Sequence, residues 1–230
     1  MREKINKISI WGIFLGFLFF STVARAAGLI TDFEVKEPMK RGETQFLMAT
    51  FKIPAVSINQ AISFEIKFDW LGHYAPVEIG LLNKAGQKSI SLRFWHYERP
   101  PECYLLVYRY RGDKLVETEE CYNPFSPFDN KTFRCRINLL ENIVFATVER
   151  GDKVLWQSEE LGWKPEIYEN GFIEVVDIWH EIKQRRGKIR YDKETEEIIF
   201  HSEGGNEPAN AFHMDGKIGN FQILETKRKD

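Results

Sequence analysis

The stretch Ile62-Ser63-Phe64-Glu65-Ile66-Lys67-Phe68-Asp69-Trp70 alternates apolar and polar side chains without interruption. In an extended strand, successive side chains point to opposite faces of the sheet. The apolar side chains of this stretch therefore share one face, and the polar ones share the other. This pattern predicts a strand of an antiparallel sheet that buries one face and leaves the other in water.

The same period-two alternation continues along the chain, and no segment after residue 26 carries a helical stripe of useful length. We expect further strands near Phe46–Ile53, Val77–Leu82, Ser89–Tyr97, Cys103–Tyr110, Leu115–Tyr122, Thr132–Leu139, Ile143–Glu149 and Ile218–Leu224, and a pair at Ile189–Tyr191 and Ile198–His201. The stretch Gly171–Glu181 is apolar on both faces, which indicates a central strand. About a dozen short strands without helical crossovers predict two packed antiparallel sheets or a closed barrel.

Three short polar segments are typical of hairpin turns. Arg-Gly-Asp-Lys occurs at residues 111–114 and again at 150–153, each time between two alternating apolar runs, and Asn83–Gln87 separates two more. Tight hairpin turns need a positive φ angle, which glycine adopts without strain. Both Arg-Gly-Asp sequences are therefore interpreted as turns, in preference to an adhesion motif of the integrin-binding type.

Three segments resemble elements of the concanavalin A-like (laminin G-like) jelly rolls: the opening Ile30–Val35, the closing Gly219–Leu224 and the hairpin Thr147–Trp156. The first two look like the paired terminal strands of that group. The resemblance implies an all-β, two-sheet antiparallel β-sandwich formed by one domain, residues 27–230. Members of the group bind or cleave glycans, bind proteins or build surfaces, so the fold alone does not choose among these functions.

The first 26 residues are predicted to be a secretory signal peptide. Arg2, Lys4 and Lys7 form a positive head, residues 8–20 form an uncharged apolar run, and Ala24-Arg25-Ala26 places small residues where a signal peptidase cleaves. The run is shorter than the roughly 20 apolar residues that span a bilayer. We therefore expect cleavage before Ala27, no membrane span, and a secreted or periplasmic protein.

Charge and composition exclude one class of partner. Without residues 1–26 the chain keeps 28 basic and 33 acidic residues, a net charge of about −5, with both signs interspersed. A nucleic-acid-binding protein normally carries a basic patch, and none is visible here. We expect no nucleic-acid partner. The oligomeric state is not specified by the sequence.

The chain has three cysteines, Cys103, Cys121 and Cys135, so at most one intrachain disulfide can form. Folding about Gly112 brings Cys103 and Cys121 almost opposite each other on a hairpin. A bridge between Cys121 and Cys135, across the loop 123–130, is the alternative. Hairpin geometry favours the first pair.

The candidate ligand-binding residues lie on the predicted strand Ser89–Tyr97 and on the next hairpin. Two sets of side chains alternate along the first of these strands: Ile90, Leu92, Phe94 and His96 on one face, and Ser91, Arg93, Trp95 and Tyr97 on the other. If the first set faces the core, the second stands on the outer or concave face, and Tyr108 and Tyr110 can extend it. Aromatic rings cover the C–H patches of a sugar, and neighbouring polar groups bind its hydroxyls. A second apolar layer, covered by the loop 123–130, is the alternative interpretation.

Two enzymatic hypotheses find less support. Glycosidases of the concanavalin A-like group carry Glu-x-Asp-x-Glu on one strand, and the nearest match is Asp177-Ile178-Trp179-His180-Glu181. Trp179 replaces the middle acid, which leaves Asp177 and Glu181 about 13 Å apart, so a buried strand that ends in exposed charges is favoured. A polysaccharide lyase would need a base such as His96 or Tyr97 near Arg93, with His180 and His201 converging on them.

No metal-binding motif is present. A structural calcium ion, as in many concanavalin A-like domains, would leave little trace in the sequence, and Asp215 and Asn220 are weak candidates for its ligands. No other cofactor is expected. The sequence therefore predicts an exported binding module, with a glycan as the first expected ligand. A protein-interaction or structural envelope domain comes second, and a polysaccharide-degrading enzyme third.

Overall fold

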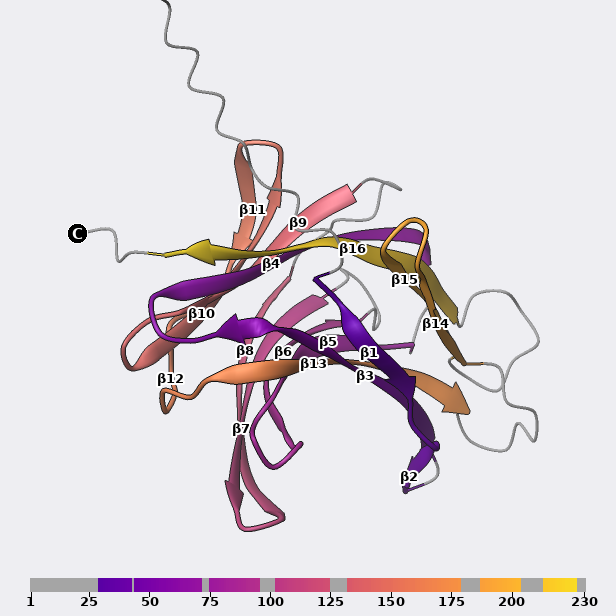
Figure 1. Cartoon of the computed structure of the whole chain (residues 1–230), viewed down its shortest axis with the longest axis horizontal. Coiled ribbons are helices and arrows are strands. Elements are labelled where there is room, and N and C mark those ends of the chain that lie inside the picture. Colours follow the sequence, from indigo (N-terminus) through magenta and orange to yellow (C-terminus); the bar gives the residue numbers. More distant parts are fainter. Residues whose placement is uncertain are drawn as a thin grey trace, which may run out of the picture.

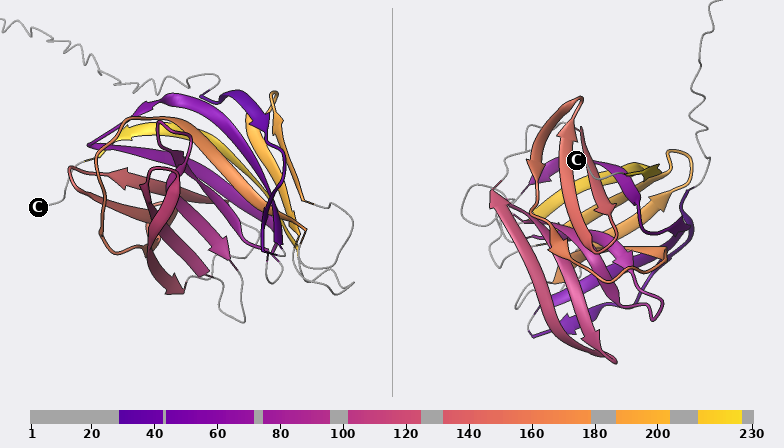
Figure 2. Two further views of the ribbon diagram at one scale, coloured as in Figure 1. Left: turned by 90° about the horizontal axis from the view of Figure 1, so that it is seen from below. Right: turned by 90° about the vertical axis from the view of Figure 1, so that its left-hand side faces the viewer.

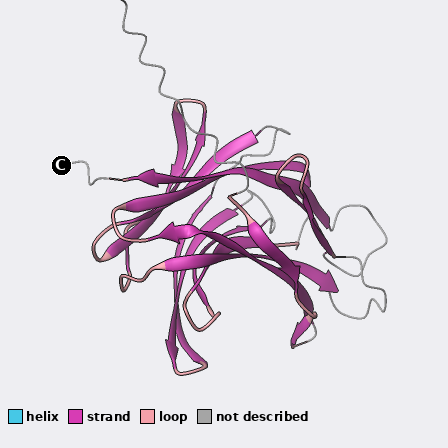
Figure 3. Ribbon diagram, viewed as in Figure 1, coloured by secondary structure: helices cyan, strands magenta, loops and turns pink. Residues whose placement is uncertain are grey.

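The computed structural model describes residues 29–42, 44–71, 75–95, 102–124, 132–178, 187–203 and 213–226. These residues form sixteen strands and no helix, so none of them offers a helix that could cross a membrane (Figure 3). The first sheet consists of β1 (Thr31–Val35), β2 (Met39–Arg41), β3 (Thr44–Val56), β5 (Val77–Leu82), β6 (Lys88–Trp95), β7 (Glu102–Arg111), β8 (Lys114–Pro124) and β13 (Tyr168–Ile178). The second consists of β4 (Gln60–Leu71), β9 (Thr132–Leu139), β10 (Ile143–Arg150), β11 (Lys153–Gln157), β12 (Leu161–Gly162), β14 (Lys188–Asp192), β15 (Glu197–Glu203) and β16 (His213–Glu225).

The two sheets are antiparallel and stack into a curved sandwich (Figures 1 and 2). The strand order of the first sheet is β1-β3-β13-β5-β6-β7-β8, with β2 beside β3. That of the second is β11-β10-β9-β4-β16-β15-β14, with β12 beside β10. Neighbours in the sheets are often distant in sequence, as in a jelly roll, and this confirms the predicted two-sheet β-sandwich.

Aromatic side chains from both sheets meet in the core between them. Phe51 of β3 lies 5.7 Å from Phe221 of β16 between ring centroids, and Phe94 of β6 lies 5.4 Å from Phe68 of β4. Edge-to-face pairs of this kind stabilise a core beyond the area that they bury. Phe68 belongs to the stretch 62–70, whose alternating apolar side chains face the core as predicted: Ile62, Phe64, Ile66 and Phe68 are all buried.

The central position predicted for the stretch after Gly171 is confirmed, because β13 lies between β3 and β5. The predicted pairing of the terminal strands is wrong. β1 pairs with β3 in the first sheet, whereas β16 lies between β4 and β15 in the second. Their side chains account for the difference: β1 is short and mostly exposed, as suits an edge, whereas β16 buries Met214, Ile218 and Phe221 and needs a neighbour on each side.

The predicted hairpin turns are confirmed. Arg111 pairs with Lys114, and Arg150 pairs with Lys153. Gly112 has a φ of 61° and Gly151 a φ of 58°, while the aspartate that follows each of them keeps a negative φ. A positive φ at the first central residue alone is the pattern of a type II′ turn, which suits the twist of a hairpin. Both Arg-Gly-Asp sequences thus serve as turns.

Candidate ligand-binding surface

The side chains of β6 divide between the two faces of the first sheet as predicted. Ile90, Leu92 and Phe94 are buried in the core, whereas Arg93 and Trp95 are half-buried on the opposite, outer face. Arg93 lies opposite Tyr104 of β7, and residues two apart along a strand share a face. Tyr104, Tyr108 and Tyr110 therefore join Arg93 and Trp95 on the outer face, where all three rings are half-buried.

Five charged side chains cross the middle of this outer face in a row of alternating sign: Arg41, Glu174, Lys88, Glu78 and Arg93. We call this arrangement the charge row. The two terminal nitrogens of the Arg41 guanidinium, Nη1 and Nη2, each donate to one carboxylate oxygen of Glu174 at 2.9 Å. The Lys88 ammonium lies 2.7 Å from Glu174 Oε1 and 3.1 Å from Glu78 Oε1. Arg93 Nη2 donates to Glu78 Oε2 at 3.1 Å.

Lys88 reaches the outer face because the strand pairing is irregular at its position. In a regular strand Lys88 would share the core face with Ile90, two residues further on. The register of β5 and β6 shifts between Leu81 and Leu82, so that Leu82 pairs with Lys88 while Leu81 pairs with Ile90. An extra residue of this kind redirects a side chain to the other face.

The charge row keeps Glu78 ionised. Burial by itself raises the pKa of the Glu78 carboxyl, but the charges of Lys88 and Arg93 and hydrogen bonds from Tyr108 and Ser91 outweigh it and lower the pKa to about 2. The Tyr108 hydroxyl donates to Glu78 Oε1 at 2.6 Å. Burial, followed by the charge of Glu78, raises the pKa of Tyr108 in turn. The Tyr108 hydroxyl therefore stays protonated and acts as a fixed donor.

The charge row forms a largely buried floor of the outer face. The side chains of Glu78 and Glu174 are each 4% exposed, whereas those of Arg93 and Arg41, at the two ends of the row, are 28% and 47% exposed. Burial raises the pKa of Tyr110, and the charge of Arg41 acts on the same hydroxyl in the opposite direction. Above this floor, at its rim, the outer face presents aromatic rings and the edges of the Arg41 and Arg93 guanidinium groups to a ligand.

This floor is poorly suited to hydrolysis of a glycosidic bond. A glycosidase needs one carboxyl group that holds a proton near neutral pH and a second that is ionised. Glu78 and Glu174 lie directly opposite each other on β5 and β13, but both are engaged by cationic side chains, and Glu78 has a lowered pKa. They act as a structural pair.

The described residues of the enzymatic hypotheses are not brought together. Asp177 is buried, so the predicted exposed end of this strand is wrong at that position. His201 lies on β15 of the second sheet, whereas Arg93 lies on β6 of the first, so His201 does not approach it. Tyr97, His96, His180 and Glu181 lie outside the described residues.

The two suggested calcium ligands, Asp215 and Asn220, each have partners within the protein. Asp215 faces two histidines, with its carboxylate oxygens 2.5 Å from His201 Nδ1 and 2.9 Å from His213 Nε2. Asn220 instead accepts a hydrogen bond from Gln222. Calcium binds six to eight oxygens, and no group of three or more His, Cys, Asp or Glu in the described part of the chain is placed to hold a metal ion.

The two cysteines of the predicted disulfide are not opposite each other. Cys103 pairs with Asn123 and Cys121 with Leu105. The turn between Arg111 and Lys114 by itself would set Cys103 opposite residue 122, and the register shift between Arg109 and Tyr110 moves its partner one residue further. Cys103 and Cys121 share a face diagonally, a separation of about 7 Å or more between Cα atoms in a regular ladder. The bridge stays a prediction, since the side chain of Cys121 is not described. Cys135 is a buried free thiol.

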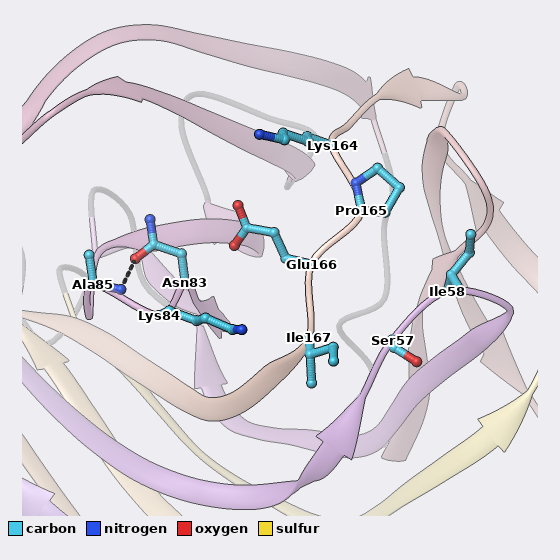
Figure 4. A pocket seen from close by; sticks show the side chains of 9 residues that line it. All are labelled: Ser57, Ile58, Asn83, Lys84, Ala85, Lys164, Pro165, Glu166 and Ile167. Atoms are coloured by element: carbon cyan, nitrogen blue, oxygen red, sulfur yellow. Dashed lines mark hydrogen bonds between the residues drawn. The ribbon is translucent and has the colours of Figure 1, made fainter.

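A concave feature lies at one end of the sandwich, away from the charge row. A groove of about 600 Å³ is lined by three loops, and its lining residues are Ser57, Ile58, Asn83, Lys84, Ala85, Lys164, Pro165, Glu166 and Ile167 (Figure 4). None of these residues was singled out as a ligand contact in the sequence. Single polar and apolar loop residues carry no pattern, and only the fold brings these three loops together.

The chain has the concanavalin A-like jelly-roll fold. The Ca2+-bound form of the VIP36 exoplasmic/lumenal domain has a TM-score of 0.51 and 7% identity, over 88% of this chain and 85% of that one. The form bound to Ca2+ and Man3GlcNAc has a TM-score of 0.50 and 9% identity over the same shares. A legume lectin-like domain from Entamoeba histolytica gives 0.48 and 10% identity, over 85% of this chain and 90% of that one. No protein-family model and no curated protein matches the sequence.

Proposed function

We propose that this protein is an exported glycan-binding module and that the glycan lies on the outer face of the first sheet. The observation that carries the proposal is the set of half-buried rings of Trp95, Tyr104, Tyr108 and Tyr110 beside the guanidinium of Arg93. Flat rings stack on the C–H faces of a pyranose, and guanidinium N–H groups donate to its hydroxyls.

The hydrogen-bonding capacity of the rim supports this role. Arg93 donates from Nε and Nη2 to Glu78 and from Nη2 to the Tyr108 hydroxyl. Arg41 donates from Nη1 and Nη2 to Glu174. A guanidinium has five N–H donors, so Nη1 of Arg93 and Nε of Arg41 remain available to a ligand. The ion pairs below hold both groups in place, which reduces the entropy lost on binding.

The similar structures and the sequence add further support. The VIP36 domain of the same fold is described as a complex with Man3GlcNAc. The N-terminal segment, with its basic head and apolar run, supports export to the periplasm or the cell exterior. N-terminal sequencing of the exported protein tests this part, and Ala27 is the expected first residue.

The test of glycan binding compares two matched variants. The purified mature chain is screened on a glycan array, and hits are measured by calorimetry. Trp95→Ala is expected to weaken binding at least about tenfold, or about 1.4 kcal/mol, with unchanged folding by circular dichroism. Phe145→Ala, which removes a half-buried ring from β10 of the other sheet, is the control and should bind normally. Absence of binding to every glycan, or equal effects of both substitutions, would contradict the proposal.

A further inference from the structure

The groove at the end of the sandwich is built by three segments that are far apart in sequence. The connection from β3 to β4 contributes Ser57 and Ile58, the β5–β6 loop contributes residues 83–85, and the segment before β13 contributes residues 164–167. In Figure 4 the side chain of Glu166 points from one wall toward the loop that carries Asn83 and Ala85. A volume of about 600 Å³ lies within the range of ligand-binding pockets.

Two of the walls are braced by hydrogen bonds of their backbone and side chains. In the first wall, the backbone N–H of Ser57 donates to Gln60 Oε1 at 2.8 Å, and that of Asn59 donates to the Leu139 carbonyl at 2.7 Å. In the second wall, Asn83 Oδ1 accepts from the backbone N–H groups of Ala85 and Gln87 at 3.0 and 2.9 Å. These bonds brace both loops.

The third wall is anchored on either side by a buried aromatic residue. Trp163 donates from its indole nitrogen to the Leu140 carbonyl at 2.8 Å, and the Tyr168 hydroxyl lies 3.0 Å from Ser89 Oγ. The two rings stack with centroids 5.9 Å apart. The segment between them is thus held at both ends, and the groove has its shape before any ligand arrives. Preformed shape lowers the entropic cost of binding.

The groove combines exposed apolar side chains with cationic side chains that have no acidic partner. Ile58 and Ile167, which both line the groove, are 36% and 49% exposed. Within the described part of the chain, Lys84, Lys164 and Glu166 form no ion pair, although most charged residues elsewhere on the surface do. The groove therefore carries a net positive charge.

The third wall also has backbone groups that can form hydrogen bonds with a ligand. Residues 164–167 belong to no strand, and their backbone groups form no hydrogen bond with another described residue. Pro165 has no N–H, but the other three residues offer donors, and all four offer carbonyl oxygens. An extended peptide satisfies such groups along its length, which is how peptides bind to open backbone edges.

We infer that the groove is a docking site for an extended, acidic segment of a partner protein. Its aspartate or glutamate side chains pair with Lys84 and Lys164, and its alternate apolar side chains cover Ile58 and Ile167. This site is separate from the outer face of the first sheet and does not depend on glycan binding there.

The inference is tested with defined peptides. The probes are a fluorescein-labelled ten-residue peptide in which aspartate and valine alternate between Gly-Ser ends, and the same peptide with lysine for aspartate. Fluorescence anisotropy with the mature chain should show binding of the aspartate peptide. The lysine peptide should bind at least about tenfold more weakly. Binding of the aspartate peptide should also weaken with added salt, because ion pairs near solvent are screened.

Two substitutions and two matched controls locate the site. Lys164→Glu and Ile167→Ser should each weaken binding about fivefold or more, about 1 kcal/mol. Lys153→Glu and Val154→Ser alter an exposed lysine and a 51%-exposed valine at the start of β11, after the turn that follows β10, and should leave binding unchanged. Equal binding of both peptides, loss of binding in the control variants, or no binding of the aspartate peptide at millimolar concentration overturns the inference. So does displacement of the peptide by a glycan that binds through the outer face, since the groove would then belong to the glycan site.

Discussion

Glu78 and Glu174 lie directly opposite each other on β5 and β13, and the ammonium group of Lys88 lies between them, 3.1 Å from the first and 2.7 Å from the second. Two buried carboxylates on neighbouring strands repel each other strongly unless a cation separates them. Lys88 supplies that cation, and Arg41 and Arg93 complete the neutralisation from the two sides.

Replacement of Lys88 by methionine should therefore be strongly destabilising. The substitution keeps the apolar stem and removes the charge, which leaves Glu78 and Glu174 facing each other in a buried site. Loss of one partner from a buried ion pair costs about 3–5 kcal/mol, and urea denaturation should show a loss of that size. Lys153→Met, at an exposed turn, is the control, with a change within about 0.5 kcal/mol. Adding Glu78→Gln and Glu174→Gln to Lys88→Met should restore part of the stability. A Lys88→Met variant as stable as the parent would contradict this account of the charge row.

Stability should fall in acid because of Glu78. Its pKa is lowered from an ordinary value near 4.5 to about 2 in the folded protein, so the unfolded chain binds a proton more readily. The stabilisation is fully present above about pH 4.5 and is lost as the pH falls toward 2. Denaturation curves between pH 7 and pH 2 measure this loss. The variant Glu78→Gln should be less stable at pH 7 and should show a shallower decline below pH 4.5. An equally steep decline in that variant would assign the acid sensitivity to other groups.

Much of the fold follows from local patterns. Alternation in residues 62–70 and 89–95 predicts both strands and the face that each buries, and the Gly-Asp turns predict two hairpins. These features are determined by residues that are close together in the sequence, so they can be predicted from the sequence alone. The partners of β1 and β16 depend on which distant strands bury their remaining faces, and no local pattern contains that information.

The candidate surface was predictable only in part. Arg93, Trp95, Tyr108 and Tyr110 share the outer face as their spacing predicts, but the floor beneath them was missed. A single glutamate inside an otherwise apolar strand, as in Val77–Leu82, is a signal of a buried charge that needs a partner. The identity of that partner could not be predicted, because Lys88 reaches the face through a local register shift and Arg41 through tertiary packing.

Cys135 should remain reduced and unreactive in the folded protein. Its thiol is fully buried between the sheets, and burial raises its pKa, so the reactive thiolate is scarce. Labelling with a thiol reagent should modify Cys135 only after unfolding, and peptide mapping under non-reducing conditions should find it unpaired. A peptide that links Cys121 to Cys135 would contradict this prediction and would also exclude the bridge between Cys103 and Cys121.

Tyr108 and Tyr110 lie two residues apart on β7, and removal of their hydroxyl groups should have different consequences. The Tyr108 hydroxyl donates to Glu78 Oε1 at 2.6 Å and forms part of the floor. Tyr108→Phe leaves an ionised, buried carboxylate short of one donor, which should cost about 1–3 kcal/mol of stability. The Tyr110 hydroxyl forms no hydrogen bond with another described residue, so Tyr110→Phe should change stability by less than about 0.5 kcal/mol.

For binding of the glycan found on the array, the order of the two effects should reverse: Tyr110→Phe should have the larger effect and Tyr108→Phe the smaller. Tyr110 keeps its hydroxyl for the ligand, so Tyr110→Phe should weaken binding about three- to tenfold, which corresponds to one hydrogen bond of about 1 kcal/mol. Tyr108→Phe keeps the aromatic ring at the surface and changes only a donor already committed to Glu78, so its binding should fall less than that of Tyr110→Phe once the folded fraction is taken into account. Calorimetric binding and urea denaturation of both variants measure the two effects separately. If Tyr110→Phe binds like the parent while Trp95→Ala does not, the ligand lies on the Trp95 side of the face and does not reach the β7 turn.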